Sequence, residues 1–209
     1  MEYRALTKVD ADKELEFSTR LFSGLWKEHY SQPGSDHSLR ILDLGGVQSS
    51  SIDFFSLYSC YITIADAIES LAKFDPDVEN ELDEQALEQA VKTRIQFEQP
   101  PYDLILGWDC FSHLPAHLFP FVHAHLLQAC HKNTYIHGFL YTSEKRYSQP
   151  GQFYILAEDK VACYENLSPP LRTRPMNSLM LMNKMPGFAL QRSVLMRNGM
   201  QEFILRREE

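Results

Sequence analysis

The sequence has few cysteines, and none of them is spaced as a metal site or a disulfide framework would require. No two of the four form a Cys-x-x-Cys pair, so their spacing predicts neither a zinc site nor a set of structural disulfides. Reduced thiols are typical of a reducing compartment, so we expect a cytoplasmic protein. The four are Cys60, Cys110, Cys130 and Cys163.

Long apolar runs are missing as well. Residues 1–8 contain no apolar stretch of the kind that forms a signal peptide. No segment approaches the roughly 20 apolar residues that a membrane-spanning helix needs. We therefore expect a soluble protein with no membrane partner.

Positive charge is scarce. The chain has 20 lysines and arginines against 28 aspartates and glutamates, which gives a net charge of −8. An acidic surface repels phosphate backbones, and the densest basic runs, at 172–174 and 206–207, are short. We expect no nucleic-acid partner. The sequence carries no signal for an oligomeric state.

Histidine is frequent between positions 113 and 131, but a metal-binding set is incomplete. His113 and His117 have the i, i+4 spacing of metal ligands on a helix, whereas His123 and His125 point to different helix faces. No cysteine or carboxylate completes a ligand set with them. We expect no metal ion.

The remaining pattern is one of alternating helices and strands. The chain has 209 residues, 44% of them hydrophobic, which is enough for one sizeable core. Apolar periodicity predicts strands at 40–44, 61–65, 94–97, 102–107 and 135–141, and helices at 12–30, 80–92, 115–130 and 175–185 with a short helix after 49–51. Asn198-Gly199 between two apolar runs predicts a terminal hairpin, 188–196 with 200–205.

This order predicts an α/β fold, a three-layer sandwich with a mostly parallel seven-stranded sheet and an antiparallel terminal hairpin. We interpret 1–209 as a single domain. Residues 1–34 form an N-terminal helix in which Trp26 and Tyr30 serve either as a lid or as core. Residues 142–174 are a candidate substrate-pocket insertion with a small hairpin, 153–156 and 161–164. The methionines of 175–185 are interpreted as core.

One group of motifs indicates a ligand-binding site. A predicted strand ends in Asp43-Leu44-Gly45-Gly46, a helix with serines at its start follows, and the next strand ends at Asp66. Glycines let a ligand approach the backbone closely, and a carboxylate at a strand end can accept hydrogen bonds from ribose hydroxyls. The alternative is a plain tight turn with an unrelated loop acid.

Several segments in this order resemble class I S-adenosylmethionine-dependent methyltransferases. They are 41–46 (Ile-Leu-Asp-Leu-Gly-Gly), 63–67 (Thr-Ile-Ala-Asp-Ala), 102–106 with 111–114, and 186–188 through 203–205. The resemblance covers residues 40–206. It implies methyl transfer from S-adenosylmethionine, with S-adenosylhomocysteine as product, and a sheet whose last strand is reversed.

The resemblance also implies roles for single residues. Asp43, Gly45 and Gly46 would line the methionine end of the cofactor, and Asp66 would hold the ribose. Ala67 would lie near the adenine edge, with Glu98 or Gln99 near the adenine amino group. Gly107 and Trp108 would flank the sulfonium.

We expect the acceptor to be a small molecule, because the chain has the methyltransferase-like motifs in order and an irregular segment, 142–174, that could shape a substrate pocket. For a hydroxyl or phenol acceptor, His113 is the first candidate base and Asp109 the second. The alternative for His113 is capping or packing. Gln99-Pro100-Pro101-Tyr102 resembles a methyltransferase motif but precedes the predicted strand, so we interpret it as a rigid turn.

Two alternative functions stay open. Val47 and Ser49 stand where the family usually has glycine, and little chain separates the third and fourth predicted strands. These departures favour a catalytically degenerate binding or assembly subunit. A nicotinamide-dependent enzyme would need Gly-x-Gly-x-x-Gly, whereas residues 45–50 read Gly-Gly-Val-Gln-Ser-Ser.

Overall fold

The computed structural model describes residues 13–31, 38–74, 83–143, 151–165 and 174–208. Its central sheet has six strands in the order β3-β2-β4-β5-β9-β8. β3, β2, β4 and β5 are parallel, and β9 is antiparallel to both β5 and β8. The strands are β2 (Leu39–Asp43), β3 (Cys60–Ile64), β4 (Tyr102–Trp108), β5 (Cys130–Tyr141), β8 (Phe188–Leu195) and β9 (Met200–Arg207). The parallel sheet with a reversed final strand and a terminal hairpin is as predicted.

The prediction of seven strands is wrong, because residues 94–97 do not form a strand. α5 (Glu84–Arg94) runs into this segment, and the amide of Ile95 still donates to the carbonyl of Val91 at 2.9 Å. The Ile95 side chain is buried. The alternation of Ile95 and Phe97 thus reflects a buried helix end and the coil that follows it.

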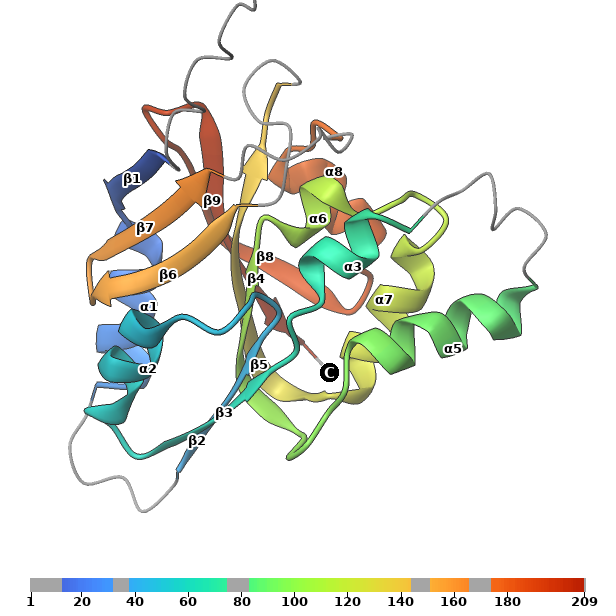
Figure 1. Cartoon of the computed structure of the whole chain (residues 1–209), viewed down its shortest axis with the longest axis horizontal. Helices are drawn as coiled ribbons and strands as arrows, with labels where there is room; N and C mark the ends of the chain where they lie inside the picture. Colours follow the sequence, from blue (N-terminus) through green and yellow to red (C-terminus); the bar gives the residue numbers. More distant parts are fainter. Residues whose placement is uncertain (1–12, 32–37, 75–82, 144–150, 166–173, 209) are drawn as a thin grey trace, which may run out of the picture.

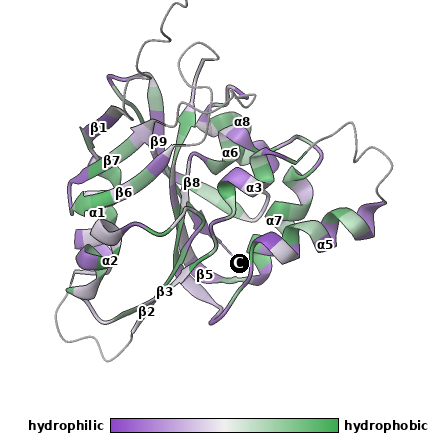
Figure 2. Cartoon of the chain, viewed as in Figure 1, coloured by the Kyte–Doolittle hydropathy of each residue, from purple (hydrophilic) through white to green (hydrophobic). Residues whose placement is uncertain are grey.

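Helices cover both faces of the sheet (Figure 1). α1 (Arg20–His29) and α2 (Ser49–Ser56) lie on one side, and α3, α5, α6, α7 and α8 lie on the other. Figure 2 shows hydrophobic and hydrophilic residues alternating along α5, whose Val91 is buried. None of the described helices is long and apolar enough to cross a membrane. The other bounds are α3 (Ile68–Ala72), α6 (Cys110–His113), α7 (Phe119–Gln128) and α8 (Ser178–Lys184).

The first predicted helix begins later than its sequence pattern suggests. Lys13–Ser18 is a strand, β1, and α1 starts at Arg20. β1 pairs with β7 (Lys160–Glu165), which pairs with β6 (Gln152–Ala157), so that a second, antiparallel sheet has the order β1-β7-β6. The hairpin predicted at 153–156 and 161–164 is confirmed. In β1 the exposed Glu14 and Glu16 alternate with the more buried Leu15 and Phe17, which is the period of a strand.

The aromatic side chain of α1 is core. Trp26 is 0% exposed and packs edge-on against Tyr58 at 4.8 Å and against Phe54 at 5.2 Å. The hydroxyl of Tyr30 donates to the carbonyl of Asp103. In the methionine-rich segment Met176 and Met185 are buried, whereas Met180 is 46% exposed and so is not core.

Candidate functional site

The carboxyl ends of β2 and β3 are joined by backbone hydrogen bonds between the loops that follow them. The amide of Asp66 donates to the carbonyl of Gly45 at 3.1 Å, and the amide of Ala67 donates to the carbonyl of Leu44 at 2.9 Å. The structure thereby brings Asp43, Gly45, Gly46, Asp66 and Ala67 into one small region. This is the edge at which ligands bind in open α/β sheets.

Asp66 presents an accessible acceptor there. Its residue is exposed, and its carboxylate makes no hydrogen bond within the described part of the chain. A Cβ built on Gly46 would lie 3.0 Å from Asp66 Oδ1, so the glycine lets the carboxylate lie directly over the loop. Asp66 has φ +46°, a left-handed conformation that aspartate tolerates better than most residues.

Asp43 is held inside the same loop. It is 5% exposed, and its Oδ1 accepts from the amide of Gly45 at 2.8 Å and from Trp108 Nε1 at 2.5 Å. Burial raises the pKa of Asp43 to about 7; the two hydrogen bonds oppose the rise and the charge of Asp66 adds to it. Asp43 therefore organises the loop from within.

Trp108 covers Gly45. A Cβ on Gly45 would lie 2.9 Å from both Cδ1 and Nε1 of the indole. The indole is 1% exposed and stacks on Phe153 of β6, with ring centroids 5.7 Å apart. At the end of β4 the pairing with β5 shifts register between Leu106 and Trp108, and Trp108 has φ +44°. This local turn aims the indole at the loop, and no sequence motif indicated it.

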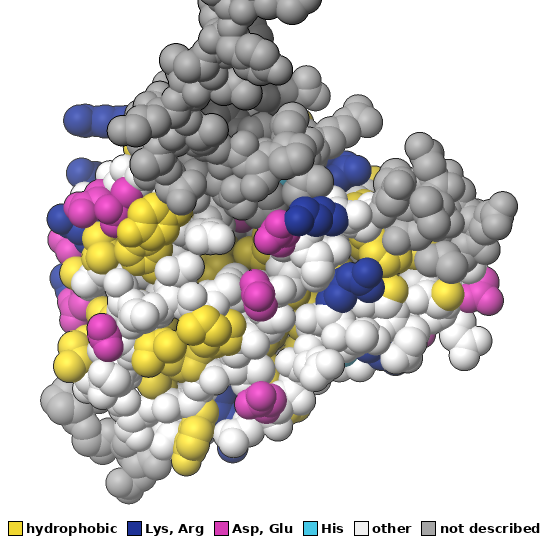
Figure 3. All heavy atoms as spheres, viewed as in Figure 1, with side chains coloured by type: hydrophobic (Ala, Val, Ile, Leu, Met, Phe, Trp, Pro, Cys, Tyr) yellow, Lys and Arg dark blue, Asp and Glu magenta, His cyan; other side chains and the backbone are white. Residues whose placement is uncertain are grey.

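Val47 and Ser49, the departures from the family pattern, do not crowd this loop. Val47 is 65% exposed, and Ser49 is exposed at the start of α2. Figure 3 shows hydrophobic side chains on the molecular surface in the region of α2.

The two candidate acid–base residues lie together just after β4. His113 Nε2 is 3.3 Å from Asp109 Oδ2, and both side chains are 0% exposed. Asp109 Oδ2 also accepts from the hydroxyl of Tyr141 at 3.0 Å and from the amide of Gly151 at 2.7 Å. Asp109 Oδ1 and both ring nitrogens of His113 have no hydrogen-bond partner within the described residues.

Such unsatisfied buried polar atoms are uncommon in folded proteins, and they mark a place where a polar ligand group would gain partners. The side chain of His113 makes no capping bond, although its carbonyl accepts from Arg174. Its ring lies edge-on to Tyr141 at 5.6 Å. Tyr141 and Gly151, which sequence reasoning missed, reach Asp109 from distant parts of the chain with no local signal.

The other predicted residues have different places. Gly107 is needed for packing, since its Cβ would lie 3.2 Å from Phe111 Cε2. Glu98 is on the loop that enters β4, where its amide donates to the hydroxyl of Tyr102. The same hydroxyl donates to Thr63 Oγ1 at 3.0 Å, near the carboxyl end of β3, and the role of Glu98 at the adenine amino group stays a prediction. Pro100 and Pro101, joined by a cis peptide bond, lie on the same loop.

Three of the histidines each pair with a different group, so they do not form one cluster. His123 Nε2 pairs with the carbonyl of Pro186, His125 Nε2 with that of Ile95, and His131 Nε2 with Asp103. Within the described residues no three His, Cys, Asp or Glu side chains form a group that could hold a metal ion.

Comparison with known proteins places this geometry in a fold. No protein-family model matches the sequence, and no curated protein sequence matches it. Among solved structures, 1,6-didemethyltoxoflavin-N1-methyltransferase from Burkholderia thailandensis, with bound 1,6-didemethyltoxoflavin and S-adenosylhomocysteine, superposes with a TM-score of 0.54 at 14% identity, over 91% of this chain and 78% of that one. The chain has the class I methyltransferase fold.

A second solved structure agrees in shape. The PH0226 protein from Pyrococcus horikoshii OT3 has a TM-score of 0.50 at 10% identity, over 90% of this chain and 88% of that one. Within its methyltransferase fold the present chain has six strands in the main sheet, and its carboxyl edge carries Asp43, Asp66 and Trp108.

Proposed function

We propose that this chain transfers the methyl group of S-adenosylmethionine to a small-molecule acceptor, with S-adenosylhomocysteine as the second product. The observation that carries the proposal is the exposed carboxylate of Asp66, which has no hydrogen-bond partner among the described residues and lies over Gly46 at the carboxyl edge of the sheet. The methyltransferase from Burkholderia thailandensis, which shares the fold, binds S-adenosylhomocysteine and 1,6-didemethyltoxoflavin.

The residues present fit the ribose end of the cofactor well. Asp66 can accept two hydrogen bonds from a diol, and Gly46 has no neighbour within 4 Å of its Cβ position except the Asp66 carboxyl group. Asp43 and Gly45 belong to the same loop, and Ala67 follows Asp66 directly. When bound, S-adenosylmethionine supplies an activated methyl group on a sulfonium.

His113 and Asp109 would handle the acceptor proton. His113 would take the proton from a hydroxyl or phenol acceptor while that oxygen accepts the methyl group that the bound cofactor would supply. Asp109, oriented by Tyr141 and the amide of Gly151, stabilises the imidazolium. We further propose a reducing compartment such as the cytoplasm, because all four cysteines are free thiols.

Two features favour the alternative of a catalytically degenerate binding subunit. The indole of Trp108 covers one side of Gly45, so a cofactor can reach that side only if the indole moves. His113 is 1% exposed, so an acceptor can reach the imidazole only if the layer over it opens. If neither the indole nor the layer over His113 moves, the chain keeps the fold but does not turn over.

Isothermal titration calorimetry with S-adenosylmethionine separates the two. The wild-type chain should bind, and Asp66→Asn should raise the Kd about tenfold or more, since asparagine tolerates positive φ but loses the charge-assisted hydrogen bonds. Asp53→Asn, an exposed acid on α2, should bind as the wild type does.

If the wild-type chain binds nothing at millimolar cofactor, the methyl-transfer proposal fails and the binding-subunit alternative stands. If it binds, radiolabelled methyl transfer to small-molecule extracts measures turnover. Binding without any transfer would also favour the alternative.

A further inference from the structure

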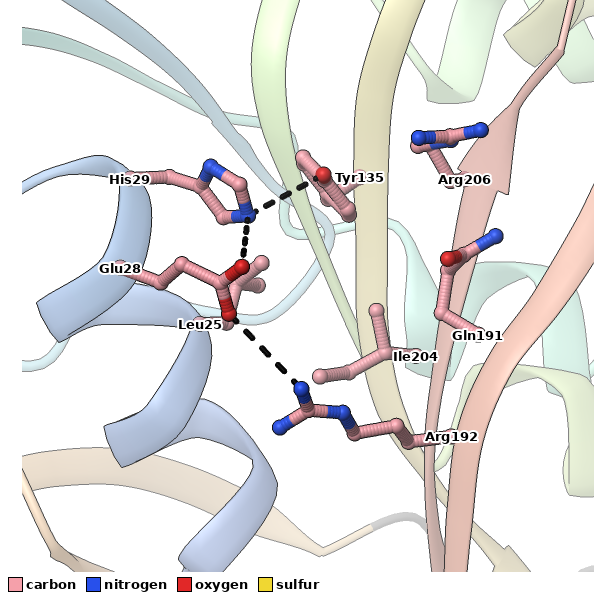
Figure 4. A pocket seen from close by; sticks show the side chains of 8 residues that line it. All are labelled: Leu25, Glu28, His29, Tyr135, Gln191, Arg192, Ile204 and Arg206. Carbon is pink, nitrogen blue, oxygen red and sulfur yellow. Dashed lines mark hydrogen bonds and ion pairs between the residues drawn. The ribbon is translucent and has the colours of Figure 1, made fainter.

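A small polar pocket lies on the other side of the molecule from Asp66, between α1 and the β5-β9-β8 side of the sheet. Figure 4 shows Glu28 and His29 of α1 on one side and Gln191, Arg192 and Arg206 of the terminal hairpin on the other. Its volume is about 190 Å³. At about 30 Å³ for each water in the liquid, this is room for a small molecule only.

Two consecutive side chains enter the pocket because of a bulge. β8 pairs with β9 through Leu190 and Leu205, and then through Arg192 and Ile204, so that Gln191 is an extra residue in β8. In a regular strand, neighbours point to opposite faces, but here Gln191 and Arg192 both line the pocket. Bulges that re-aim side chains are over-represented next to functional sites.

Arg206 provides an unused positive group. Its Nε is buried and has no hydrogen-bond partner within the described residues, and nothing else there pairs with its guanidinium. Arg206 lies opposite Tyr135 in the sheet, and the hydroxyl of Tyr135 is 3.1 Å from His29 Nε2. A guanidinium, a hydroxyl and an imidazole therefore converge on one pocket.

The charge balance of the pocket favours an anion. Arg192 and Arg206 face a single carboxylate, that of Glu28, which is 3.8 Å from Arg192 Nη2. Both members of this pair are about 60% exposed, so their attraction is weak and Arg192 can turn to a ligand. In a chain with a net charge of −8, the lining of this pocket has two arginines and one carboxylate, with Arg192 at the α1 end and Arg206 at the Tyr135 end.

We propose that this pocket binds a small molecule through an oxyanion, either a phosphate or a carboxylate group, held between Arg192 and Arg206. Arginine forks match the geometry of both groups. The pocket lies beside β5, β9 and β8, across the sheet from β3 and the Asp66 that follows it, so its ligand and the cofactor would occupy separate sites.

Calorimetric titration of the full chain with inorganic phosphate and with malonate, at constant ionic strength set by sodium chloride, tests this proposal. We expect saturable binding of at least one of the two with a Kd of millimolar or below, and the tighter anion identifies the source chemistry. Arg206→Gln should raise that Kd about tenfold or more, and Arg192→Gln should raise it as well.

Arg197→Gln is the matched control, because it removes the same charge from the exposed turn of the hairpin, outside the pocket. Its Kd should equal that of the wild type. Circular dichroism checks that each variant is folded. If Arg206→Gln does not fold, the Kd of Arg192→Gln tests the proposal. No saturable binding of either anion, or an equal loss in Arg197→Gln, overturns the proposal.

Discussion

The contact between Gly45 and Trp108 predicts that two adjacent glycines respond differently to the same substitution. Gly45→Ala places a methyl group 2.9 Å from Cδ1 and Nε1 of the indole, well inside the ordinary contact distance of about 3.5–4.0 Å. The indole cannot retreat easily, since it is buried, stacked on Phe153 and bonded to Asp43.

Overpacking of this kind costs about 1–3 kcal/mol. In a chain of this length that lowers Tm by about 2–12 °C. Gly46→Ala is the matched control. Its methyl group meets only the exposed carboxyl group of Asp66, which can turn away, and alanine also reduces the entropy of the unfolded chain. Its free energy of unfolding should change by less than about 0.5 kcal/mol.

Urea denaturation followed by circular dichroism measures both variants. In a Trp108→Ala background the additional effect of Gly45→Ala should nearly vanish, because the clashing group is gone. The reasoning is refuted if Gly46→Ala destabilises as much as Gly45→Ala, or if the effect of Gly45→Ala persists without the indole.

Three further outcomes follow from the buried polar groups. Burial raises the Asp43 pKa from 3.8 to about 7, so the free energy of unfolding of the wild type should fall by up to about 4 kcal/mol between pH 4 and pH 7. Asp43→Asn keeps an oxygen acceptor for both hydrogen bonds but cannot titrate. Urea midpoints measured across this pH range should therefore fall in the wild type and lack that slope in the variant. Glu202 of β9 accepts from Thr19, from the amide of Phe22 and from the buried His137, so Glu202→Ala should cost about 3–5 kcal/mol in the same assay, against less than about 1 kcal/mol for the surface residue in Glu16→Ala; similar losses would contradict the assignment. His113→Ala should lower kcat for a hydroxyl acceptor about 100-fold or more while the Kd for S-adenosylmethionine stays the same, and an unchanged kcat would exclude it as the base.

Much of the fold was predictable because its signals are local. Asn198-Gly199 sits at the turn of the terminal hairpin, and the parallel strands that end at Asp43 and at Ile64, two residues before Asp66, are short apolar runs before turn residues. The prediction was wrong where the apolar residues of a segment fit the spacing of a helix as well as that of a strand. Phe17 continues the spacing of Leu21 and Leu25 and so reads as helical, although its strand pairs with residues about 145 positions away.

The candidate site was predictable only in part. A motif predicted the loop of Asp43, Gly45 and Gly46 and the acid at 66. The placement of Glu98 depended on a strand that α5 replaces. The indole of Trp108 over Gly45 joins residues 63 positions apart through a register shift, and no pattern in either segment encodes that contact.

The pairing of β1 bears on when the protein can complete its fold during synthesis. Residues 13–18 find their strand partner only at 160–165, and the α1 amide of Phe22 finds its acceptor only at Glu202. Both contacts join residues 13–22 to residues beyond 159, so neither can form until most of the polypeptide has been made. Made before these partners, β1 would be among the last elements to pair, with Phe17 away from Phe139 and Phe153 until then, whereas Trp26 can already pack on Phe54 and Tyr58. A slow ribosome or an early stop would therefore expose β1 to chaperones, whereas β2, β3 and β4 find all of their strand neighbours within residues 39–141.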